Sequence, residues 1–584
     1  MKKVLIILWV LVWGIANYLF LLPTLSFTVT SGLTWNLIVF SAVLAGICAI
    51  DEEKSSASHS SVVIAKISGA IAALLFVGIV LVGILSMPLI ESSRYRNLIG
   101  SPQKDEFSSN VSPINPNQMI LVDDSIARRL GEKVLGEDPA LGSRCELGHF
   151  TLQIVKGNLY WIAPLEHSGF WKWKGNDGTP GFVAVNATNE KDVKLIKEVN
   201  GKPLSIRYLP SGFFSEDLER HIYSNGYASV GLTDYTFEVD DDWNPFWVVT
   251  TYDTKVFWLG DDATGIVIVN PETGEIESYS AKEAPKWVDR IHPIDFVMEQ
   301  VDDWGTLVHG VWNWSNRDKL QTIEDYTIVM GSDGKLYYYI GLCSVGSDES
   351  TVGFMMVDCR TKEPIWIHQT GATETAAQRS AEGIVQAERL KASEGITYNI
   401  GGHATYEFLM KDKEGLMKKI ALVSVQNYED VAVGDDRQSA IRSYLMKVGK
   451  NRGNRVSEGV SLIEKTLEGR ITRFGSEVNN GSTLYHLMIE GRNNQFISDG
   501  NFSELCLSRV GDKVRIKFIE DEGEIHLEDF DNLEFESAVS AGNVQLREKN
   551  QQIDSLRRES QKEKVLEDKF EKLTPEQKQE LLEM

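Results

Sequence analysis

Acidic side chains in front of a tryptophan are the residues of this sequence that come nearest to a chemical site. Glu238, Asp240, Asp241 and Asp242 form the first such group. Carboxylates bind hard divalent cations, so Asp240 and Asp242 are candidate metal ligands, and carboxylates also act as general acids and bases. The group lacks the glycine and the closing glutamate of an EF-hand loop. The alternative prediction is a solvated turn before a strand.

A second acidic pair, Asp302 and Asp303, also precedes a tryptophan, with His309 and Trp312 further along the chain. Tryptophan and acid together suit carbohydrate contact or cell-wall chemistry, and they suit a packed interface between modules equally. A hydrolase would bring such acids together in one cleft with a perturbed carboxyl pKa, whereas a scaffold would spread them over turns. The candidate catalytic acids are Glu238, Asp240, Asp241, Asp302 and Asp303.

The sequence contains no Walker A loop, HExxH, GxSxG or paired CxxC motif. Residues 331–335 read GSDGK, but they precede a strand-like run instead of a helix, which predicts a hairpin turn. The polar run 369–375 predicts a helix cap before Ala376. A catalytic role for Thr373 or Glu374 would need a base partner that the sequence does not show. We therefore predict no cofactor and no structural metal, and favour a protein that is not an enzyme.

Composition excludes some partners. The chain of 584 residues has a net charge of -24, and an acidic surface of this kind argues against nucleic acid as the main ligand. The five cysteines have no zinc-ligand spacing. Cys343 and Cys359 can be read either as a disulfide between neighbouring strands of an exported domain or as two small core residues.

The elements that position these residues start with a membrane anchor over residues 1–90. Three apolar runs predict transmembrane helices at 4–22, 33–50 and 63–90, the last being longer than the roughly 20 residues that span a bilayer. The first run is too long for a signal-peptide core and has no small-residue cleavage site, so we expect it to be retained.

Three spans place the two ends of the anchor on opposite sides of the membrane. The positive-inside rule narrowly puts the N-terminus in the cytoplasm. We therefore expect a multi-pass protein of the cell (inner) membrane with an extracytoplasmic soluble region, and the alternative is a cytoplasmic one. The basic residues counted for this rule are Lys2, Lys3, Lys54 and Lys66 on the predicted cytoplasmic side and Arg94, Arg96 and Lys104 on the opposite side.

A proline- and serine-containing stretch, 91–119, is predicted to be a linker. After it, one pattern repeats: an aromatic strand is followed by a second strand that begins with glycine in three of four copies. Copies about 85 residues apart are right for a small α+β unit, so we predict tandem modules over 120–448, with helices at 293–304, 375–391 and 435–448. The predicted strand pairs are 159–162 with 181–186, 245–249 with 265–270, 336–340 with 353–358, and 405–408 with 420–425.

The run Gly265 to Tyr279, GIVIVNPETGEIESY, and the run Gly353 to Trp366 resemble the strand and turn of PepSY-type modules. In that family, extracytoplasmic units pack a helix on an antiparallel sheet. The resemblance covers about 120–448. It implies a binding or inhibitory module without an active site.

Residues 449–465 are predicted to be a basic linker, and 466–535 read as five short strands. Their order resembles an OB-fold barrel, as found in membrane-anchored proteins of the NfeD group, where the barrel serves assembly. Acids outnumber bases in the barrel, whereas single-strand binders need a positive groove, so we expect it to bind protein.

Residues 543–584 predict a charged helical tail with a short coiled-coil segment. The predicted fold class is therefore a membrane protein with three N-terminal transmembrane helices, α+β tandem modules, an OB-like β-barrel and a helical tail. The expected function is a bacterial or phage-encoded scaffold or protein-binding component of a membrane or envelope assembly. Its expected partners are the lipid bilayer, other membrane or envelope proteins, and a second copy through the membrane helices or the tail. The alternatives are an envelope hydrolase and a cytoplasmic tether for nucleic acid.

Overall fold

The structure is a computed structural model that describes residues 2–29, 32–49, 59–105, 119–331, 333–346, 350–451 and, with short gaps, 465–534. The predicted tail at 543–584 and most of the basic linker at 449–465 lie outside the described residues. The chain divides into two compact units, Met1–Gly459 and Val460–Met584. Each unit is described by itself.

Three apolar helices begin the first unit: α1 (Lys2–Ala16) with its continuation η1 (Asn17–Leu21), α2 (Gly32–Ala49) and α3 (His59–Leu85). Three segments are long and apolar enough to cross a membrane, Val4–Leu21, Gly32–Ala49 and Val62–Leu85. This confirms a membrane protein with three N-terminal spanning helices.

The third helix ends earlier than the predicted residue 90. After Leu85 the chain turns, and Pro88 takes the first position of a separate helix, α4 (Pro88–Arg96), where its missing N–H costs nothing. The Ser86 carbonyl accepts a hydrogen bond from the Tyr95 hydroxyl at 2.6 Å, which fastens α4 against the end of α3. The predicted linker 91–119 is therefore wrong over its first residues, which continue α4 and then form a short strand.

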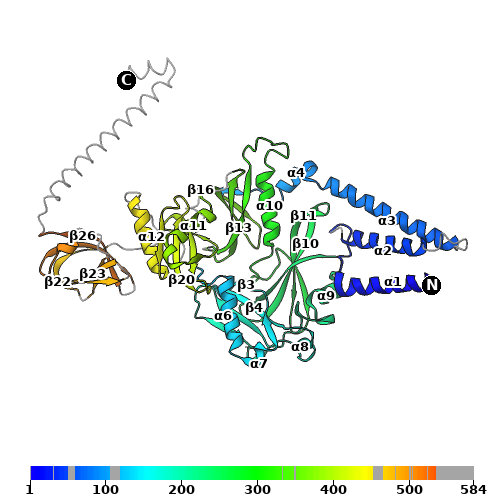
Figure 1. The fold of residues 1–584 in the computed structure, drawn as a ribbon, viewed down its shortest axis with the longest axis horizontal. Coiled ribbons are helices and arrows are strands. Elements are labelled where there is room, and N and C mark those ends of the chain that lie inside the picture. The colour runs from blue at the N-terminus through cyan, green and yellow to red at the C-terminus, as the bar shows by residue number, and fades with distance from the viewer. Residues whose placement is uncertain are drawn as a thin grey trace, which may run out of the picture. The chain divides into compact units, whose positions relative to one another are not determined.

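Four sheets follow, antiparallel except at one edge strand of the third sheet, and a helix precedes the antiparallel strands of each (Figure 1). The first sheet has the order β2-β4-β5-β6, with β3 also pairing β4. Asp123 caps its helix by accepting the Ile126 N–H at 3.0 Å. The elements are α6 (Asp124–Gly136), β2 (Cys145–Leu147), β3 (Thr151–Val155), β4 (Asn158–His167), β5 (Phe182–Asn186) and β6 (Val193–Ile196).

The second sheet has the order β12-β11-β10-β9. Its hairpins are long, and the turn after β11 is held by the Asn270 side chain, which accepts the N–H groups of Glu272 at 3.0 Å and Thr273 at 3.1 Å. The elements are η3 (Phe214–Glu216), α9 (Leu218–Ile222), η4 (Tyr223–Tyr227), β9 (Gly231–Val239), β10 (Pro245–Val256), β11 (Leu259–Val269) and β12 (Ile276–Ser280).

The third sheet has the order β1-β16-β15-β14-β13. Its outer strand β1 comes from the predicted linker and runs parallel to β16, with Gln103 opposite Ile365. The elements are β1 (Gln103–Asp105), α10 (Ile294–Thr306), β13 (Leu320–Met330), β14 (Leu336–Ser344), β15 (Ser350–Asp358) and β16 (Pro364–Ala372). Between β13 and β14 the Gly331 N–H donates to the Lys335 carbonyl at 2.8 Å, which closes the predicted hairpin turn.

The fourth sheet has the order β17-β19-β20-β21, with β18 also pairing β19. Helix α11 is shorter than predicted, because the chain continues as the 3-10 turn η5 and Arg389 then adopts a left-handed φ of 58°. The elements are α11 (Glu374–Ile384), η5 (Gln386–Glu388), β17 (Lys391–Ala392), β18 (Ile396–Ile400), β19 (His403–Lys411), β20 (Met417–Ser424), β21 (Val431–Gly434) and α12 (Arg437–Asn451). Short elements accompany the first sheet: α7 (Pro139–Gly142) precedes β2, α8 (Phe170–Lys174) lies between β4 and β5, and β7 (Glu198–Val199) pairs with β8 (Lys202–Pro203) after β6.

All four predicted strand pairs are hydrogen-bonded partners. They are β4 with β5, β10 with β11, β14 with β15, and β19 with β20. The cysteines predicted as either disulfide or core, Cys343 and Cys359, are both free and buried. The region after the anchor is thus a mixed α/β region of several sheets.

Apolar side chains join the sheets to each other. The first sheet shares one buried cluster with the fourth, through residues such as Leu165 and Tyr444, and another with the second, through Phe182 and Trp247. The third and fourth sheets meet at a cluster that includes Phe354 and Phe408. Each fully buried side chain of this size contributes about 1.5–3 kcal/mol, so the four sheets form one continuous body.

The anchor is hydrogen bonded to the second sheet. The Arg220 guanidinium donates to the carbonyls of Tyr18 at 3.1 Å and Leu19 at 2.8 Å, and the Trp258 indole N–H donates to the Phe27 carbonyl at 2.6 Å. Figure 1 shows α9 beside the end of α1. The loop between α1 and α2 therefore lies on the same side of the membrane as the sheets.

The second unit contains a closed barrel of five strands in the order β22-β23-β24-β26-β25. All neighbours are antiparallel except β24 and β26, which are parallel. Its core contains Phe496 and Phe518, whose ring centroids are 5.0 Å apart. The elements are β22 (Lys465–Asn479), β23 (Ser482–Ile489), β24 (Phe496–Ser498), η6 (Leu505–Leu507), β25 (Lys513–Asp521) and β26 (Glu524–Asn532).

Candidate functional site

The acids at 240–242 form a turn after β9. Asp240 closes this turn by accepting the N–H groups of Asp242 at 2.8 Å and Asn244 at 2.9 Å, and Asp241 accepts the Lys156 N–H at 3.1 Å. Asp242 lies 3.6 Å from the Lys156 ammonium. These carboxylates hold a loop and a neighbouring hairpin in place. Among the described residues, no group of three or more His, Cys, Asp or Glu is arranged to hold a metal.

Glu238 lies apart from that turn, inside the protein. Its side chain is enclosed at the end of β9, and one carboxyl oxygen accepts the Thr236 hydroxyl at 3.0 Å. Burial raises the pKa of Glu238 to about 8. The positive charge of Arg290 lowers this pKa, whereas the negative charge of Asp289 raises it further. Asp289 is also buried, which raises its own pKa to about 7. Glu238 is therefore a core residue whose burial favours the neutral form of its carboxyl group.

Asp302 and Asp303 lie on α10 with different neighbours. Asp302 accepts the N–H of Thr322 at 3.0 Å and its hydroxyl at 3.1 Å, which ties α10 to β13. Partial burial, then the charges of Glu299 and Asp302, raise the pKa of Asp303 to about 6. Further along, His309 pairs with Asp318 at 2.9 Å, and Trp312 is exposed. The structure thus gives the α10 acids and the β9 acids separate partners.

Arg437, the first residue of α12, is half-buried. Its guanidinium donates to the carbonyls of Met119 at 3.1 Å and Thr188 at 3.2 Å, so it joins the first sheet to the fourth. It faces Glu407 of β19, whose two carboxyl oxygens have no hydrogen-bond partner among the described residues. Burial raises the pKa of Glu407 to about 8, and Arg437 opposes this rise.

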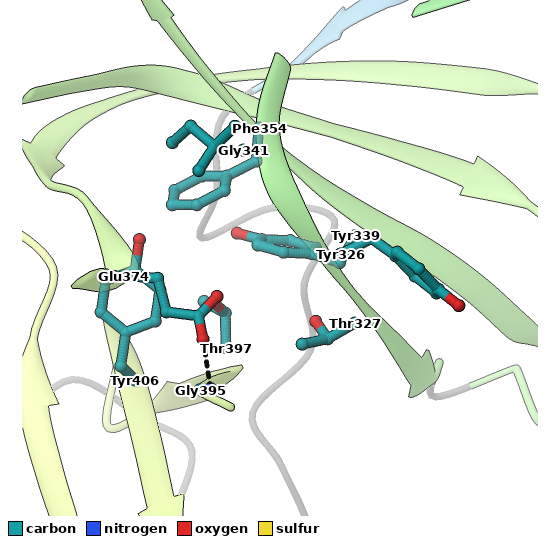
Figure 2. A pocket seen from close by; sticks show the side chains of 10 residues that line it. Tyr326, Thr327, Tyr339, Gly341, Phe354, Glu374, Gly395, Thr397 and Tyr406 are labelled. Atoms are coloured by element: carbon teal, nitrogen blue, oxygen red, sulfur yellow. Dashed lines mark hydrogen bonds between the residues drawn. The ribbon is translucent and has the colours of Figure 1, made fainter. Parts of the chain in front are cut away.

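A pocket between the third and fourth sheets is the best candidate for a binding site (Figure 2). Its cavity volume is about 20 Å³, and it is partly open to solvent. β13 and β14 supply one wall, β15 contributes Phe354, and β18, β19 and the start of α11 supply the other wall. The lining residues are Ile323, Tyr326, Thr327, Tyr339, Gly341, Phe354, Glu374, Gly395, Thr397 and Tyr406.

The aromatic wall of this pocket is built by strand pairing. Tyr339 and Phe354 lie on neighbouring strands with ring centroids 4.6 Å apart, and Phe354 meets Tyr406 edge-on at 6.4 Å. The Tyr339 hydroxyl is buried and has no hydrogen-bond partner among the described residues. Burial, and then the neighbouring Tyr406, raise its pKa well above the usual value. Such an unpaired hydroxyl costs about 1–3 kcal/mol, which a ligand atom can recover.

Glu374 supplies the charge in this pocket. Thr373 caps α11 by accepting the Ala376 N–H at 3.3 Å, as predicted, and this places Glu374 in the first turn of the helix. Its carboxylate accepts the Gly395 N–H, and its charge contributes, after burial, to the raised pKa of Tyr406. A carboxylate among aromatic rings suits a cationic group.

The sequence did not predict the pocket. Tyr326, Tyr339, Glu374 and Tyr406 come from four elements spread over about eighty residues, and only the contact between two sheets brings them together. The available signal was the aromatic run 336–340, which alternates between the two faces of β14. Glu374 was considered alone, as a catalytic residue without a base.

No protein-family model matches the chain, and no curated protein matches it. Among solved structures, the Trypanosoma rangeli sialidase in complex with 2,3-difluoro-KDN is 9% identical over 65% of this chain and 53% of that chain, with a TM-score of 0.17. The Bombyx mori GH32 beta-fructofuranosidase BmSUC1 is 11% identical over 70% of each chain, with a TM-score of 0.17. The Bacillus megaterium YpeB C-terminal domain is 15% identical over 36% of this chain and 90% of that domain, with a TM-score of 0.09. The chain spans about half the length of the sialidase, and at these TM-scores the likenesses carry no argument about fold or function.

Proposed function

We propose that this protein is a membrane-anchored, non-enzymatic binding component of a membrane or envelope assembly, and that it holds a basic side chain of a partner protein. The observation that carries the proposal is the pocket in which the side chains of Tyr339, Tyr406 and Glu374 converge. A cation over an aromatic face gains about 0.5–2 kcal/mol, and a carboxylate adds charge pairing. The net charge of -24 favours encounter with a basic partner.

Two finer features of the fold belong to this proposal. A helix followed by an antiparallel sheet occurs four times after the anchor, which supports tandem PepSY-like modules over 120–448. The barrel strand order, with its single parallel pair of β24 and β26, supports an OB-like barrel over 466–535. Both kinds of module bind other molecules and do not catalyse a reaction, which agrees with the proposed non-enzymatic function.

The hydrolase alternative requires its acids to act on one substrate. Glu238 is enclosed in the protein, and Asp240 and Asp302 each hold backbone N–H groups. These roles support structural acids, so we do not propose hydrolysis. The nucleic-acid alternative requires a continuous basic surface, whereas Arg437 binds two internal carbonyls.

Binding is tested with full-length protein in nanodiscs and two small probes, N-acetyl-lysine methylamide and the neutral N-acetyl-norleucine methylamide. We expect the lysine probe to bind in calorimetry and the norleucine probe to fail. Glu374→Gln should weaken the lysine probe about tenfold, which corresponds to about 1.4 kcal/mol. Glu388→Gln, on the exposed turn after α11, is the matched control and should leave affinity unchanged. Equal affinity for both probes, or no difference between the two variants, would contradict the proposal.

We further propose that the soluble region is extracytoplasmic, at the inner membrane. Cys506 is exposed whereas the other four cysteines are buried, so a membrane-impermeant thiol reagent reports on the position of Cys506. Labelling of intact cells is expected, with Cys506→Ser as the control for specificity. Labelling only after lysis would place the soluble region in the cytoplasm.

A further inference from the structure

The hairpin between β10 and β11 has unusual turn chemistry. Val256 pairs with Leu259, so the loop consists of Phe257 and Trp258 alone. Two-residue hairpin loops favour Asn-Gly or Asp-Gly, because they need positive φ angles and face water. Here Phe257 has a φ of 56°, a conformation that bulky residues rarely adopt. The Phe257 side chain is 42% exposed and that of Leu259 is 49% exposed. This tip is poorly suited to an aqueous surface.

The tip lies where the spanning helices leave the membrane. Trp258 donates to the Phe27 carbonyl in the loop between α1 and α2, and Thr254 donates to the Thr28 carbonyl at 2.9 Å. On its other side, the Arg94 guanidinium of α4 donates to the Lys255 carbonyl and lies 6.0 Å from the centroid of the Phe257 ring. The hairpin therefore contacts both segments that emerge from the bilayer on this side.

Other apolar side chains in these segments are also about half exposed. They belong to the α1–α2 loop, to α4 and to η3, whose Phe214 carbonyl accepts a hydrogen bond from Arg220 at 2.7 Å. Arg220 binds the end of η1 as well, so η3 is held close to the same exit point. We call this set the basal surface; it comprises Leu25, Phe27, Leu89, Ile90, Phe214, Phe257 and Leu259.

We infer that the basal surface lies in the headgroup region of the bilayer that α1, α2 and α3 span, so that the second sheet stands on the membrane through its β10–β11 hairpin. Aromatic side chains favour this region because their rings are apolar and their polar edges remain hydrated. The apolar side chains of the hairpin tip, which are unfavourably exposed in water, are therefore stabilised by contact with lipid.

Charge at the basal surface agrees with a lipid neighbour. Arg94 lies beside the Phe257 ring, and a long arginine side chain of this kind places its charge near phosphates while its stem stays among apolar groups. Arg220 is buried, and its guanidinium donates to the carbonyls of Tyr18, Leu19 and Phe214. A protein partner would have to occupy the space immediately around three spanning helices, which the bilayer already fills. Continuity with the spans therefore identifies lipid as the occupant.

Site-directed spin labelling tests the depth of the hairpin. A label at Leu259→Cys, in full-length Cys506→Ser protein in phosphatidylcholine and phosphatidylglycerol nanodiscs, is compared with one at Thr273→Cys. Thr273 is exposed in the turn at the other end of β11, about 35 Å away for an 11-residue strand. We expect a higher ratio of oxygen to nickel-chelate accessibility at position 259 than at position 273.

A label at Phe27→Cys, which also lies on the basal surface, gives a second measurement of the oxygen-to-nickel ratio. This measurement remains valid if the change at position 259 disturbs the hairpin. An oxygen-to-nickel ratio at positions 259 and 27 equal to that at 273, in folded protein, would overturn the inference. The double change Phe257→Asn and Trp258→Gly restores favoured turn residues and should keep the hairpin folded. It is expected to shift the label at 259 toward water, and an unchanged ratio would overturn the role of these two side chains.

Discussion

Glu407 offers the most direct test of the buried charges. Its carboxyl group lies between the first and fourth sheets with both oxygens unpaired among the described residues, and its pKa is raised to about 8. An unfolded chain would restore a pKa near the reference value of about 4.3. Between these two values the folded state therefore binds one proton more than the unfolded state.

The sign of the effect follows from this difference in bound protons. Stability from the protonated carboxyl is fully present below the unfolded pKa, and it is lost as pH rises through the folded pKa. The free energy of unfolding falls by about 1.4 kcal/mol per pH unit in this window, or about 3 kcal/mol between pH 5 and pH 7. Glu407→Gln removes the titration and should remove this slope.

The assay is urea unfolding of the full-length protein in detergent, followed by tryptophan fluorescence at pH 5, 6, 7 and 8. We expect the wild type to lose stability with rising pH and Glu407→Gln to lose about 3 kcal/mol less between pH 5 and pH 7. Glu429→Gln, at an exposed position after β20, is the control and should follow the wild type. Equal slopes for Glu407→Gln and wild type would refute a protonated, buried Glu407.

Further predictions concern side chains that stabilise the fold through hydrogen bonds and the accessibility of the cysteine thiols. Arg360 donates to the Pro285 carbonyl at 2.7 Å and the Val288 carbonyl at 2.6 Å, so Arg360→Ala should lower the free energy of unfolding by about 2–4 kcal/mol in the urea assay, and Arg360→Lys by less. Asp123→Ala removes the cap of α6 and should cost about 1–2 kcal/mol in the same assay, whereas Asp124→Ala, which retains the cap, should cost less. In detergent, a thiol reagent should modify one cysteine, Cys506, in native protein and all five after denaturation, counted by mass spectrometry. Fast reaction of Cys359 without denaturant would contradict its burial.

Local patterns predicted much of the fold. Each predicted strand pair combines an aromatic or β-branched run with a turn of Asn, Asp or Gly, and these signals act over a few residues. The cap at Asp123 and the turn at Asn270 were predictable for the same reason, since their side chains bond N–H groups two or three residues away.

Features that depend on distant contacts were not predictable. Tyr339 and Glu374 line one pocket although 35 residues separate them along the chain, and nothing near Arg437 in the sequence indicates that its guanidinium binds the Met119 carbonyl. The helix 63–90 was predicted too long, because Met87 to Ile90 are apolar although Pro88 starts a new helix. Apolar composition alone does not distinguish the end of a span from an interfacial helix.

The strand β1 has a consequence for how the chain is made and divided. It completes the edge of the third sheet from a position next to the membrane helices, whereas its partner Ile365 lies far along the chain. During synthesis β1 has no partner strand until β16 has been made. The third sheet is therefore completed late. A soluble fragment that starts at residue 119 would leave the β16 edge uncovered and prone to strand pairing between molecules. A fragment that starts at Leu98 would keep that edge covered and should remain monomeric for longer.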